Sequence, residues 1–227
     1  MCGRYYRRSD KQRIAEAYRL GEIPFDLVLP DWDFNVAPTT FQPVIRDDKE
    51  TRKRELVLMR WGLVPFFTKQ LSDVEGVSTI NARAESVEES PIWRAPFKKR
   101  RCLVPADGFY EWVSFDPKNK QPFAFRMADD APFAFAGLWD AWEEPSGRWL
   151  QSFSIITTDA NELMAPVHDR MPVIIRPKDY NRWLDCDAKR PPVDLLRPCE
   201  SEAMVAAPCN KEVGNIRKNG PEMLNSA

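Results

Sequence analysis

The sequence predicts an α+β fold: a single domain built on a curled, mostly antiparallel sheet with short peripheral helices. Many short runs rich in β-branched and aromatic residues are typical of strands, few segments carry a long helical repeat, and 20 prolines interrupt the runs. No internal repeat, low-complexity segment or linker rich in Gly and Ser divides the 227 residues. We therefore expect one domain over residues 1–227, long enough to bury its own core.

The first predicted element is a short amphipathic helix over residues 10–20. Ser9 and Gln12 have the spacing of a capping box, apolar residues recur at helical spacing from Ile14, and Gly21 ends the pattern. The residues ahead of this helix then form an extended lead-in.

A hairpin and a second short helix follow. Apolar residues over 44–46 and 55–61 flank a polar turn, as in two paired strands. Ser90 before Pro91 is typical of a helix N-terminus, because serine caps the first turn and proline fits its first position. We expect this helix to reach Phe97.

The remaining predicted elements are strands, followed by two short helices. Each predicted strand is a run of β-branched and aromatic residues between turn residues. The strands cover residues 102–104, 109–113, 122–127, 133–139, 149–157 and 173–176, and the helices cover residues 179–184 and 193–196.

The total charge gives no indication of a nucleic-acid partner, but the distribution of the cationic residues does. Lys and Arg (33) nearly balance Asp and Glu (34). A local basic cluster still acts within about 8 Å at physiological salt. For either cluster alone, the alternative to nucleic-acid binding is a solvated surface. The two clusters are Arg4, Arg7, Arg8, Lys11 and Arg13, and then Lys98, Lys99, Arg100 and Arg101.

The five cysteines argue against a disulfide framework and against a structural zinc site. Their number is odd, they are widely spaced and no two form a CxxC pair. No stretch approaches the roughly 18 apolar residues of a membrane span, and the charged first residues lack the apolar region of a secretory signal. We expect a cytoplasmic protein with four inert, reduced cysteines.

The fifth cysteine, Cys2, follows the initiator methionine and therefore has special chemistry. If Met1 is removed, Cys2 carries a free α-amine, with a reference pKa of about 7.7 to 8.0, beside its thiol. The amine can form a Schiff base with an aldehyde, and the thiolate can then close a five-membered thiazolidine ring, favoured by proximity. The alternative is that Cys2 stands there by accident of position.

Two further residues are candidates for proton transfer. His168, the single histidine, sits beside an aspartate and an arginine where a polar loop meets an apolar strand. Glu111 shares a strand face with Phe109 and Val113, and low dielectric would raise the pKa of such a carboxyl, as a general acid requires. A structural histidine and an edge glutamate are the alternatives.

Asn81 and Arg83 are candidates for binding roles. They are two residues apart in the run STINARAES, so they lie on one side of an extended segment. An amide can orient a thiol or hydroxyl, and a guanidinium can bind a phosphate through two hydrogen bonds.

Seven blocks of the sequence resemble the SOS-response-associated peptidase (SRAP) family, whose members are also called abasic-site processing proteins. They are spread over nearly the whole chain and together are highly specific. The blocks are MCGRY at the start, APT at 37–39, RWGLVP at 60–65, INARAE at 80–85, RCLVPADGFYEW at 101–112, HDRMP at 168–172 and VGNIRKNGPEML at 213–224.

The resemblance implies a SRAP-like fold and a shield for abasic sites in single-stranded DNA, joined covalently to the sugar aldehyde through Cys2. It also implies autoproteolytic release of whatever precedes the cysteine, and lyase-type resolution of the adduct. The implied catalytic residues are Cys2, Asn81, Glu111 and His168, and the implied DNA-binding residues are Arg4, Pro38, Trp61, Arg83 and Arg170.

One feature departs from the family pattern. After the RWGLVP block the family often carries tryptophan, whereas Phe66 and Phe67 stand here. A phenylalanine can still stack on a base, at about 1 to 3 kcal/mol per base. We include both among the predicted DNA-binding residues.

The expected partner is therefore single-stranded DNA that contains abasic sites, with no metal, no organic cofactor and no membrane. We expect a cytoplasmic monomer that associates with the nucleoid when bound to DNA. Two other classes remain open: an N-terminal-nucleophile cysteine hydrolase, since some glutamine amidotransferases also begin Met-Cys-Gly, and a non-catalytic reader of modified DNA bases.

Overall fold

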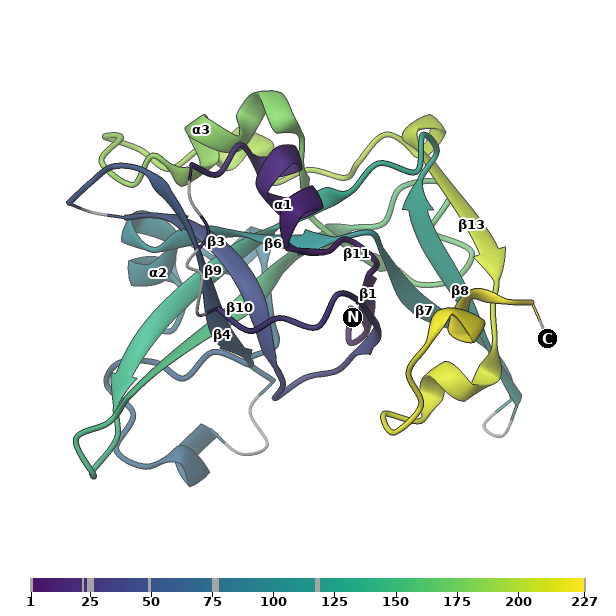
Figure 1. Cartoon of the computed structure of the whole chain (residues 1–227), viewed down its shortest axis with the longest axis horizontal. Helices are drawn as coiled ribbons and strands as arrows, with labels where there is room; N and C mark the ends of the chain where they lie inside the picture. Colours follow the sequence, from purple (N-terminus) through teal and green to yellow (C-terminus); the bar gives the residue numbers. More distant parts are fainter. Residues whose placement is uncertain are drawn as a thin grey trace.

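The structure is a computed structural model that describes residues 2–21, 23, 27–48, 50–74, 78–116 and 119–226. It consists mainly of two sheets, with short helices at the periphery (Figure 1). This confirms the predicted α+β class with a curled, mostly antiparallel sheet.

The larger sheet curls into a barrel-like shape. β10 pairs with both β4 and β9, so the path β10–β4–β3–β6–β9 returns to β10. All pairs along this path are antiparallel except β10–β4, where Ser152 lies opposite Arg60. The strands are β3 (Phe41–Asp47), β4 (Arg54–Trp61), β6 (Arg101–Ala106), β9 (Phe133–Glu143) and β10 (Trp149–Asp159).

Three short strands extend this sheet, and two of them, β5 and β11, carry predicted site residues. They are β5 (Asn81–Arg83), β11 (Arg170–Pro172) and β12 (Ile174–Ile175). Thr157 of β10 is in register with Arg83 on β5 and with Pro172 on β11. β5 and β11 therefore meet at the end of β10.

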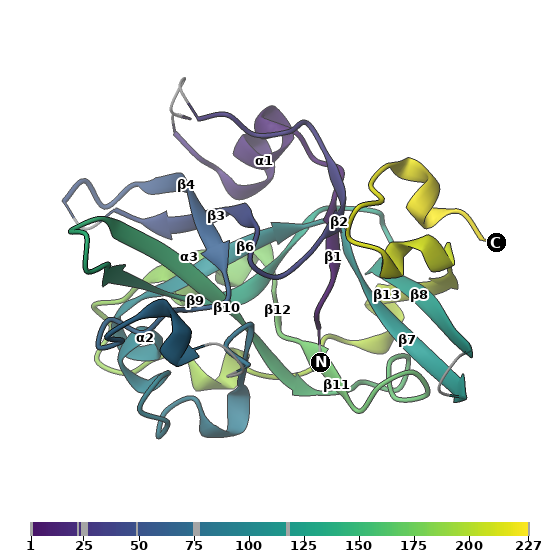
Figure 2. The same ribbon diagram turned by 90° about the horizontal axis from the view of Figure 1, so that it is seen from below.

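The smaller sheet is open, with the order β13–β8–β7–β1–β2. β1 pairs antiparallel with β7 and lies between the barrel-like sheet and β7, β8 and β13 (Figures 1 and 2). The strands are β1 (Tyr5–Arg7), β2 (Asp33–Val36), β7 (Gly108–Asp116), β8 (Asn119–Met127) and β13 (Met204–Pro208).

A glycine allows β1 to approach β7 closely. A Cβ atom at Gly108 would lie 2.3 Å from the ring of Tyr6, which no side chain can tolerate. Gly108 therefore leaves room for the Tyr6 ring where β1 pairs with β7.

The main core joins the two sheets through aromatic side chains. Tyr5 of β1 meets Trp61 of β4 at 5.3 Å and Phe135 of β9 at 5.6 Å, both edge to face. Phe109 of β7 stacks on Phe125 of β8 at 5.2 Å. Burial of each such ring contributes roughly 1.5 to 3 kcal/mol, so the cleft between the sheets is a packed interior.

Short helices cover the edges of the sheets. They are α1 (Lys11–Tyr18), α2 (Arg94–Lys99) and α3 (Tyr180–Leu184), with one-turn 3-10 helices at Leu71–Val74, Ala84–Ser86, Pro177–Asp179, Val193–Leu195, Ser201–Ala203, Lys211–Gly214 and Pro221–Leu224. No helix among the described residues has the length and apolar character needed to cross a membrane.

The helix starts differ from the prediction. Asp10, rather than Ser9, caps α1, because its side chain accepts the N–H of Arg13, while the Ser9 hydroxyl bonds to Asp107. α2 begins at Arg94, three residues later than Pro91 would place it. The predicted helix over 193–196 is a 3-10 turn.

The predicted hairpin and the later strands are confirmed, most of them with longer bounds than expected. The sequence prediction missed five of the short strands that the structure describes, β1, β2, β5, β11 and β13, each of three to five residues. All five cysteines are free, and Cys186 alone is partly exposed.

Candidate active site

The predicted nucleophile lies on the extended lead-in to β1. The N–H of Tyr110 donates to the carbonyl of Arg4 at 3.0 Å, so this lead-in runs beside β7, the strand of Glu111. The Cys2 side chain is 1% exposed, and its Sγ lies 4.0 Å from the carbonyl oxygen of Arg4. The thiol is therefore held inside the molecule, next to the strand that carries the candidate acid.

Burial and nearby charges shift the pKa of both Cys2 and Glu111. Burial raises the pKa of the Cys2 thiol far above its usual range, and the negative charge of Glu111 raises it further. Burial also raises the pKa of Glu111 to about 7, and the carboxylate of Asp169 acts in the same direction. A carboxyl that titrates near neutrality can both donate and accept a proton, whereas the thiol stays protonated until a base or a substrate takes its proton.

His168 lies on the loop before β11, next to Asp169. Its Nδ1 is 3.0 Å from the N–H of Arg170 and 2.8 Å from a carboxylate oxygen of Asp169. In a neutral ring, Nδ1 accepts the hydrogen bond from the N–H of Arg170, whereas a protonated ring would pair with the carboxylate of Asp169. Burial lowers the pKa of His168, which favours the neutral ring with Nδ1 as acceptor and the hydrogen on Nε2.

Asn81 brings an acceptor to the end of β10. Its Nδ2 donates to the carbonyl of Ile155 at 3.4 Å, and its Oδ1 is buried without a hydrogen-bond partner among the described residues. A buried acceptor without a donor costs about 1 to 3 kcal/mol. Such an atom is suited to a donor that a substrate or a processed chain end would supply.

The three predicted phosphate-binding arginines differ in their surroundings. Arg83 is exposed at the end of β5. Arg4 is partly buried, which lowers the pKa of its guanidinium, and it donates to Asn35 Oδ1 at 3.0 Å.

Arg170 is already engaged. Its side chain is 12% exposed and pairs with Glu85 through two bonds of 2.8 and 2.9 Å, with Asp159 at 2.8 Å and with the carbonyl of Thr157 at 2.8 Å. A phosphate that binds Arg170 must therefore compete with two carboxylates. The sequence prediction missed Glu85, Asp159 and the Arg4 partner Asn35; for Glu85, the signal was its place two residues after Arg83.

The residues predicted to line the path of a DNA strand separate into two groups. Phe66 and Phe67 are 60% and 53% exposed, with their rings edge to face at 5.3 Å, and Pro38 is partly exposed in a turn. Trp61 is fully buried and its Nε1 donates to the carbonyl of Ile80 at 3.0 Å. The structure therefore does not support a DNA contact by the Trp61 side chain.

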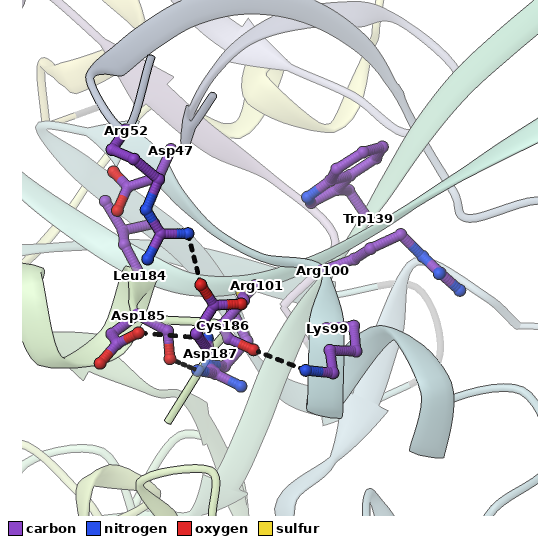
Figure 3. A pocket seen from close by; sticks show the side chains of 10 residues that line it. All are labelled: Asp47, Arg52, Lys99, Arg100, Arg101, Trp139, Leu184, Asp185, Cys186 and Asp187. Atoms are coloured by element: carbon purple, nitrogen blue, oxygen red, sulfur yellow. Dashed lines mark hydrogen bonds and ion pairs between the residues drawn. The ribbon is translucent and has the colours of Figure 1, made fainter. Parts of the chain in front are cut away.

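A large cavity of about 610 Å³ lies elsewhere, between the end of α2, α3 and the β3–β4 hairpin (Figure 3). None of the predicted site residues lines it. Arg52 pairs with Asp187 at 2.6 Å, and Lys99 donates to the carbonyl of Cys186 at 3.3 Å. Arg101 is buried and donates to four backbone carbonyls, which makes this part of the second basic cluster structural.

No metal centre is evident in the part of the chain that the structure describes. There, no group of three or more His, Cys, Asp or Glu side chains could hold an ion. The groups available to the candidate site are therefore the thiol, the tuned carboxyl, the imidazole and the buried amide oxygen.

Comparison with known proteins agrees with the sequence blocks. A sequence model described as SOS response associated peptidase (SRAP) matches residues 1–216. The chain is 37% identical to the abasic site processing protein YoqW of Bacillus subtilis, over 100% of both chains. It is 29% identical to the mouse abasic site processing protein HMCES, over 99% of this chain and 75% of that one.

A solved structure of a protein from Bacteroides thetaiotaomicron has the same fold. Its TM-score is 0.87, with 28% sequence identity and 100% coverage of both chains. The sequence match and the fold agree along the chain, and we conclude that it belongs to the SOS response associated peptidase family.

Proposed function

We propose that this protein processes abasic sites in single-stranded DNA by forming a covalent thiazolidine with them through Cys2, after removal of Met1. Family membership and the names of relatives such as YoqW and HMCES support abasic-site DNA as the target. The observation that carries the chemistry is the buried Cys2 thiol beside Glu111, whose pKa is about 7.

The proposed reaction starts when the abasic sugar opens. Glu111, in its protonated form, donates a proton to the ring oxygen, the C1′–O4′ bond breaks, and the C1′ hydroxyl returns its proton to the carboxylate as C1′ becomes an aldehyde. The unprotonated amine of Cys2 adds to C1′, and loss of one water gives an imine. Neutral His168, on the same loop as Asp169, is available to accept or return a proton.

Ring closure follows at the same carbon. Sγ of Cys2 adds to the imine carbon, the thiol proton passes to the imine nitrogen, and a thiazolidine results. One aldehyde, one amine and one thiol have then become one ring and one water, with no change of oxidation state. Asn81 Oδ1, buried without a partner among the described residues, is suited to accept a hydrogen bond from the Cys2 amine during these steps.

We assign binding of the strand to exposed groups. Arg83 offers a guanidinium to a phosphate, Phe66 and Phe67 offer ring faces to bases, and Arg170 becomes available when a phosphate displaces Glu85 or Asp159. Autoproteolytic release of a residue ahead of Cys2, slow β-elimination by Glu111 and His168, a monomeric state and association with the nucleoid belong to the same proposal.

A denaturing gel tests the proposal. The protein is incubated with single-stranded oligonucleotides that do or do not contain one abasic site. We expect a band of protein joined to DNA with the abasic strand alone. Glutamine or peptide turnover without that band would indicate a cysteine hydrolase. Binding to modified duplex DNA without that band would indicate a reader of modified bases.

A further inference from the structure

The segment that carries Phe66 and Phe67 is held at alternate residues by side chains of the β9–β10 hairpin. The N–H of Val64 donates to Ser152 Oγ at 2.8 Å, and the N–H of Phe66 donates to Asp140 Oδ2 at 3.1 Å. Two residues further on, Trp142 Nε1 donates to the carbonyl of Thr68 at 2.6 Å. We call Ser152, Asp140 and Trp142 the anchor.

The three anchor residues are neighbours on one face of the hairpin. Ser152 on β10 lies directly opposite Asp140 on β9, and Trp142 follows Asp140 by two residues, which returns its side chain to the same face. All three side chains are buried. The segment therefore rests on a continuous buried surface instead of pairing as a strand.

Asp140 makes two further contacts besides its hydrogen bond to the Phe66 segment. Its Oδ1 accepts the N–H of Ala141 at 2.9 Å and lies 3.1 Å from Arg100 Nε, while its Oδ2 accepts the N–H of Phe66. A buried carboxylate is unfavourable unless it is paired and hydrogen-bonded. Here Arg100, from the second basic cluster, supplies the charge and the two amides supply the hydrogen bonds.

The side chains that this anchored segment presents are apolar and exposed. The N–H of Thr68 donates to the carbonyl of Pro65 at 3.0 Å and closes a turn between them, so Phe66 and Phe67 occupy the turn itself. Their rings meet edge to face and remain more than half exposed. A rigid turn that displays two ring faces is suited to stacking, because little conformational freedom is lost when a base covers them.

We propose that Asp140, Ser152 and Trp142 are positioning residues that fix Phe66 and Phe67 in one orientation for stacking on bases of single-stranded DNA. The proposal rests on the proposed function for its ligand. It predicts that the anchor contributes to DNA affinity through the two phenylalanines alone, and not through charge.

Equilibrium binding to a fluorescently labelled single strand, with and without an abasic site, tests this role. Asp140→Asn keeps one acceptor oxygen but turns an NH₂ group toward N–H donors, so at least one contact breaks. Trp142→Phe removes the donor to Thr68 and part of a buried ring, and Ser152→Ala removes the acceptor for Val64. We expect each variant to weaken binding, by roughly 10-fold for Asp140→Asn, with an unchanged slope of log affinity against log salt.

Ser154→Ala is the matched control. Ser154 is two residues from Ser152 on the same buried face of β10, and its hydroxyl has no hydrogen-bond partner among the described residues. The same substitution there should leave DNA affinity unchanged. Thermal unfolding of every variant reports stability separately, and the Trp142 and Ser152 variants carry the test if Asp140→Asn does not fold.

A double-mutant cycle gives the decisive readout. In a Phe66→Ala, Phe67→Ala background the anchor has no ring to position, so adding Asp140→Asn, Trp142→Phe or Ser152→Ala should change affinity by less than about two-fold. The proposal would be overturned if the anchor substitutions lowered affinity equally with and without Phe66 and Phe67. It would also be overturned if the anchor variants that keep both phenylalanines bound DNA with wild-type affinity. If the wild-type protein formed no crosslink, the proposed function would be contradicted. The double-mutant cycle measured with an intact strand would still test the role of the anchor.

Discussion

The Cys2 centre and the cavity of Figure 3 both contain polar side chains, but they differ in how well those side chains are paired. In the cavity, Arg52 meets Asp187 and Lys99 meets a backbone carbonyl. At the centre, burial raises the pKa of Cys2 and of Glu111. The basic side chains of the cavity are thus paired with acceptors, although burial also raises the pKa of Asp47 there, whereas the buried centre holds a thiol and a carboxyl whose ionisation is unfavourable.

Two residues summarise the difference in energetic terms. The Arg101 guanidinium donates to the carbonyls of Trp183, Phe97, Lys98 and Asp185, so a buried charge is fully surrounded by acceptors. Asn81 Oδ1 is equally buried but has no donor among the described residues. The first arrangement stabilises the fold, and the second is favourable only once something else binds.

The largest effect is expected from blocking the amine of Cys2. An uncleavable extension ahead of Cys2 keeps the thiol but converts the amine to an amide, which cannot form an imine. We expect complete loss of the DNA adduct, with and without borohydride. Mass spectrometry confirms that the extension is retained, and a stable adduct from the extended protein would exclude the thiazolidine.

Two substitutions separate the roles of the amine and the thiol. Cys2→Ser and Cys2→Ala keep a free amine when Met1 is removed, but neither side chain closes the ring as a thiolate does. Both should form an adduct only when borohydride traps the imine. A denaturation-resistant adduct from Cys2→Ala without reductant would mean that a different residue supplies the bond.

The next largest effect is expected at Glu111. Glu111→Gln removes the proton donor but keeps a side chain of similar shape. Because general acid–base catalysis contributes about 10²- to 10⁴-fold, we expect crosslinking to slow by about 100-fold. Glu111 acts as an acid only when protonated, so its contribution is present at low pH and falls as pH rises through about 7. The amine has the opposite dependence, so the wild-type rate should be bell-shaped.

The variant should lose the descending limb of that profile and keep the ascending one. Crosslinking rates measured from pH 5 to 9 on a denaturing gel provide the check. An unchanged rate across this range would make Glu111 a purely structural residue. Glu88→Gln, at an exposed position, is the matched control.

The same substitution should change stability with a defined sign. The pKa of Glu111 is raised from 4.5 to about 7 on folding, so the folded state is favoured most below pH 4.5 and loses this stability as pH rises to about 7. Glu111→Gln avoids burying the charge. Chemical denaturation should therefore show a variant that is more stable at pH 8, on the order of 3 kcal/mol, and no such gain at pH 4.

Glu111 and the strands around it show which features could be predicted from the sequence alone. The burial of Glu111 followed from its alternation with Phe109 and Val113, because strand geometry places such residues on one face. The longer strands were predictable for the same reason. β1 and β5 were not, because three-residue strands show no periodicity and form only through long-range partners such as β7 and β10.

Contacts between distant segments were equally hidden from sequence patterns. Trp61 sits in a block that the resemblance linked to DNA, yet its side chain fills the core against Tyr5 and Phe153. The pairing of Arg170 with Glu85 joins residues 85 positions apart. Neither could be predicted, because composition and spacing do not specify which long-range partner satisfies a side chain.

On the cavity side, the comparison predicts a loss of stability without a loss of chemistry. Arg101→Met leaves four backbone carbonyls, two of them buried, without their donor, so we expect about 2 to 3 kcal/mol of destabilisation in chemical denaturation. The crosslinking rate per folded molecule should stay within two-fold of wild type. Arg52→Met, which breaks the exposed pair with Asp187, should cost less than about 1 kcal/mol. A large rate loss in Arg101→Met would mean that the cavity and the centre are coupled.

The smallest expected effect distinguishes two arginines at the rim of the centre. Arg83 is exposed, whereas Arg170 is held by Glu85 and Asp159. Arg83→Ala should weaken binding to abasic and intact single strands alike, by several-fold, and reduce the salt slope by about 0.7, the value for one phosphate contact on a single strand. Arg170→Ala should weaken binding in the same lesion-independent way but change the slope less, because part of its charge is already neutralised by carboxylates.

Glu85→Gln tests whether that competition is real. It keeps one acceptor oxygen but turns an NH₂ group toward the guanidinium, so at least one of the two bonds of 2.8 and 2.9 Å breaks, and it removes one negative charge from the rim. If Arg170 binds phosphate, Glu85→Gln should raise affinity in the wild-type background more than in Arg170→Ala, where only the charge remains to act. Equal gains in both backgrounds would show that Arg170 stays with Asp159 and Thr157 and contributes structure at the end of β10, leaving Arg83 as the phosphate contact of this rim.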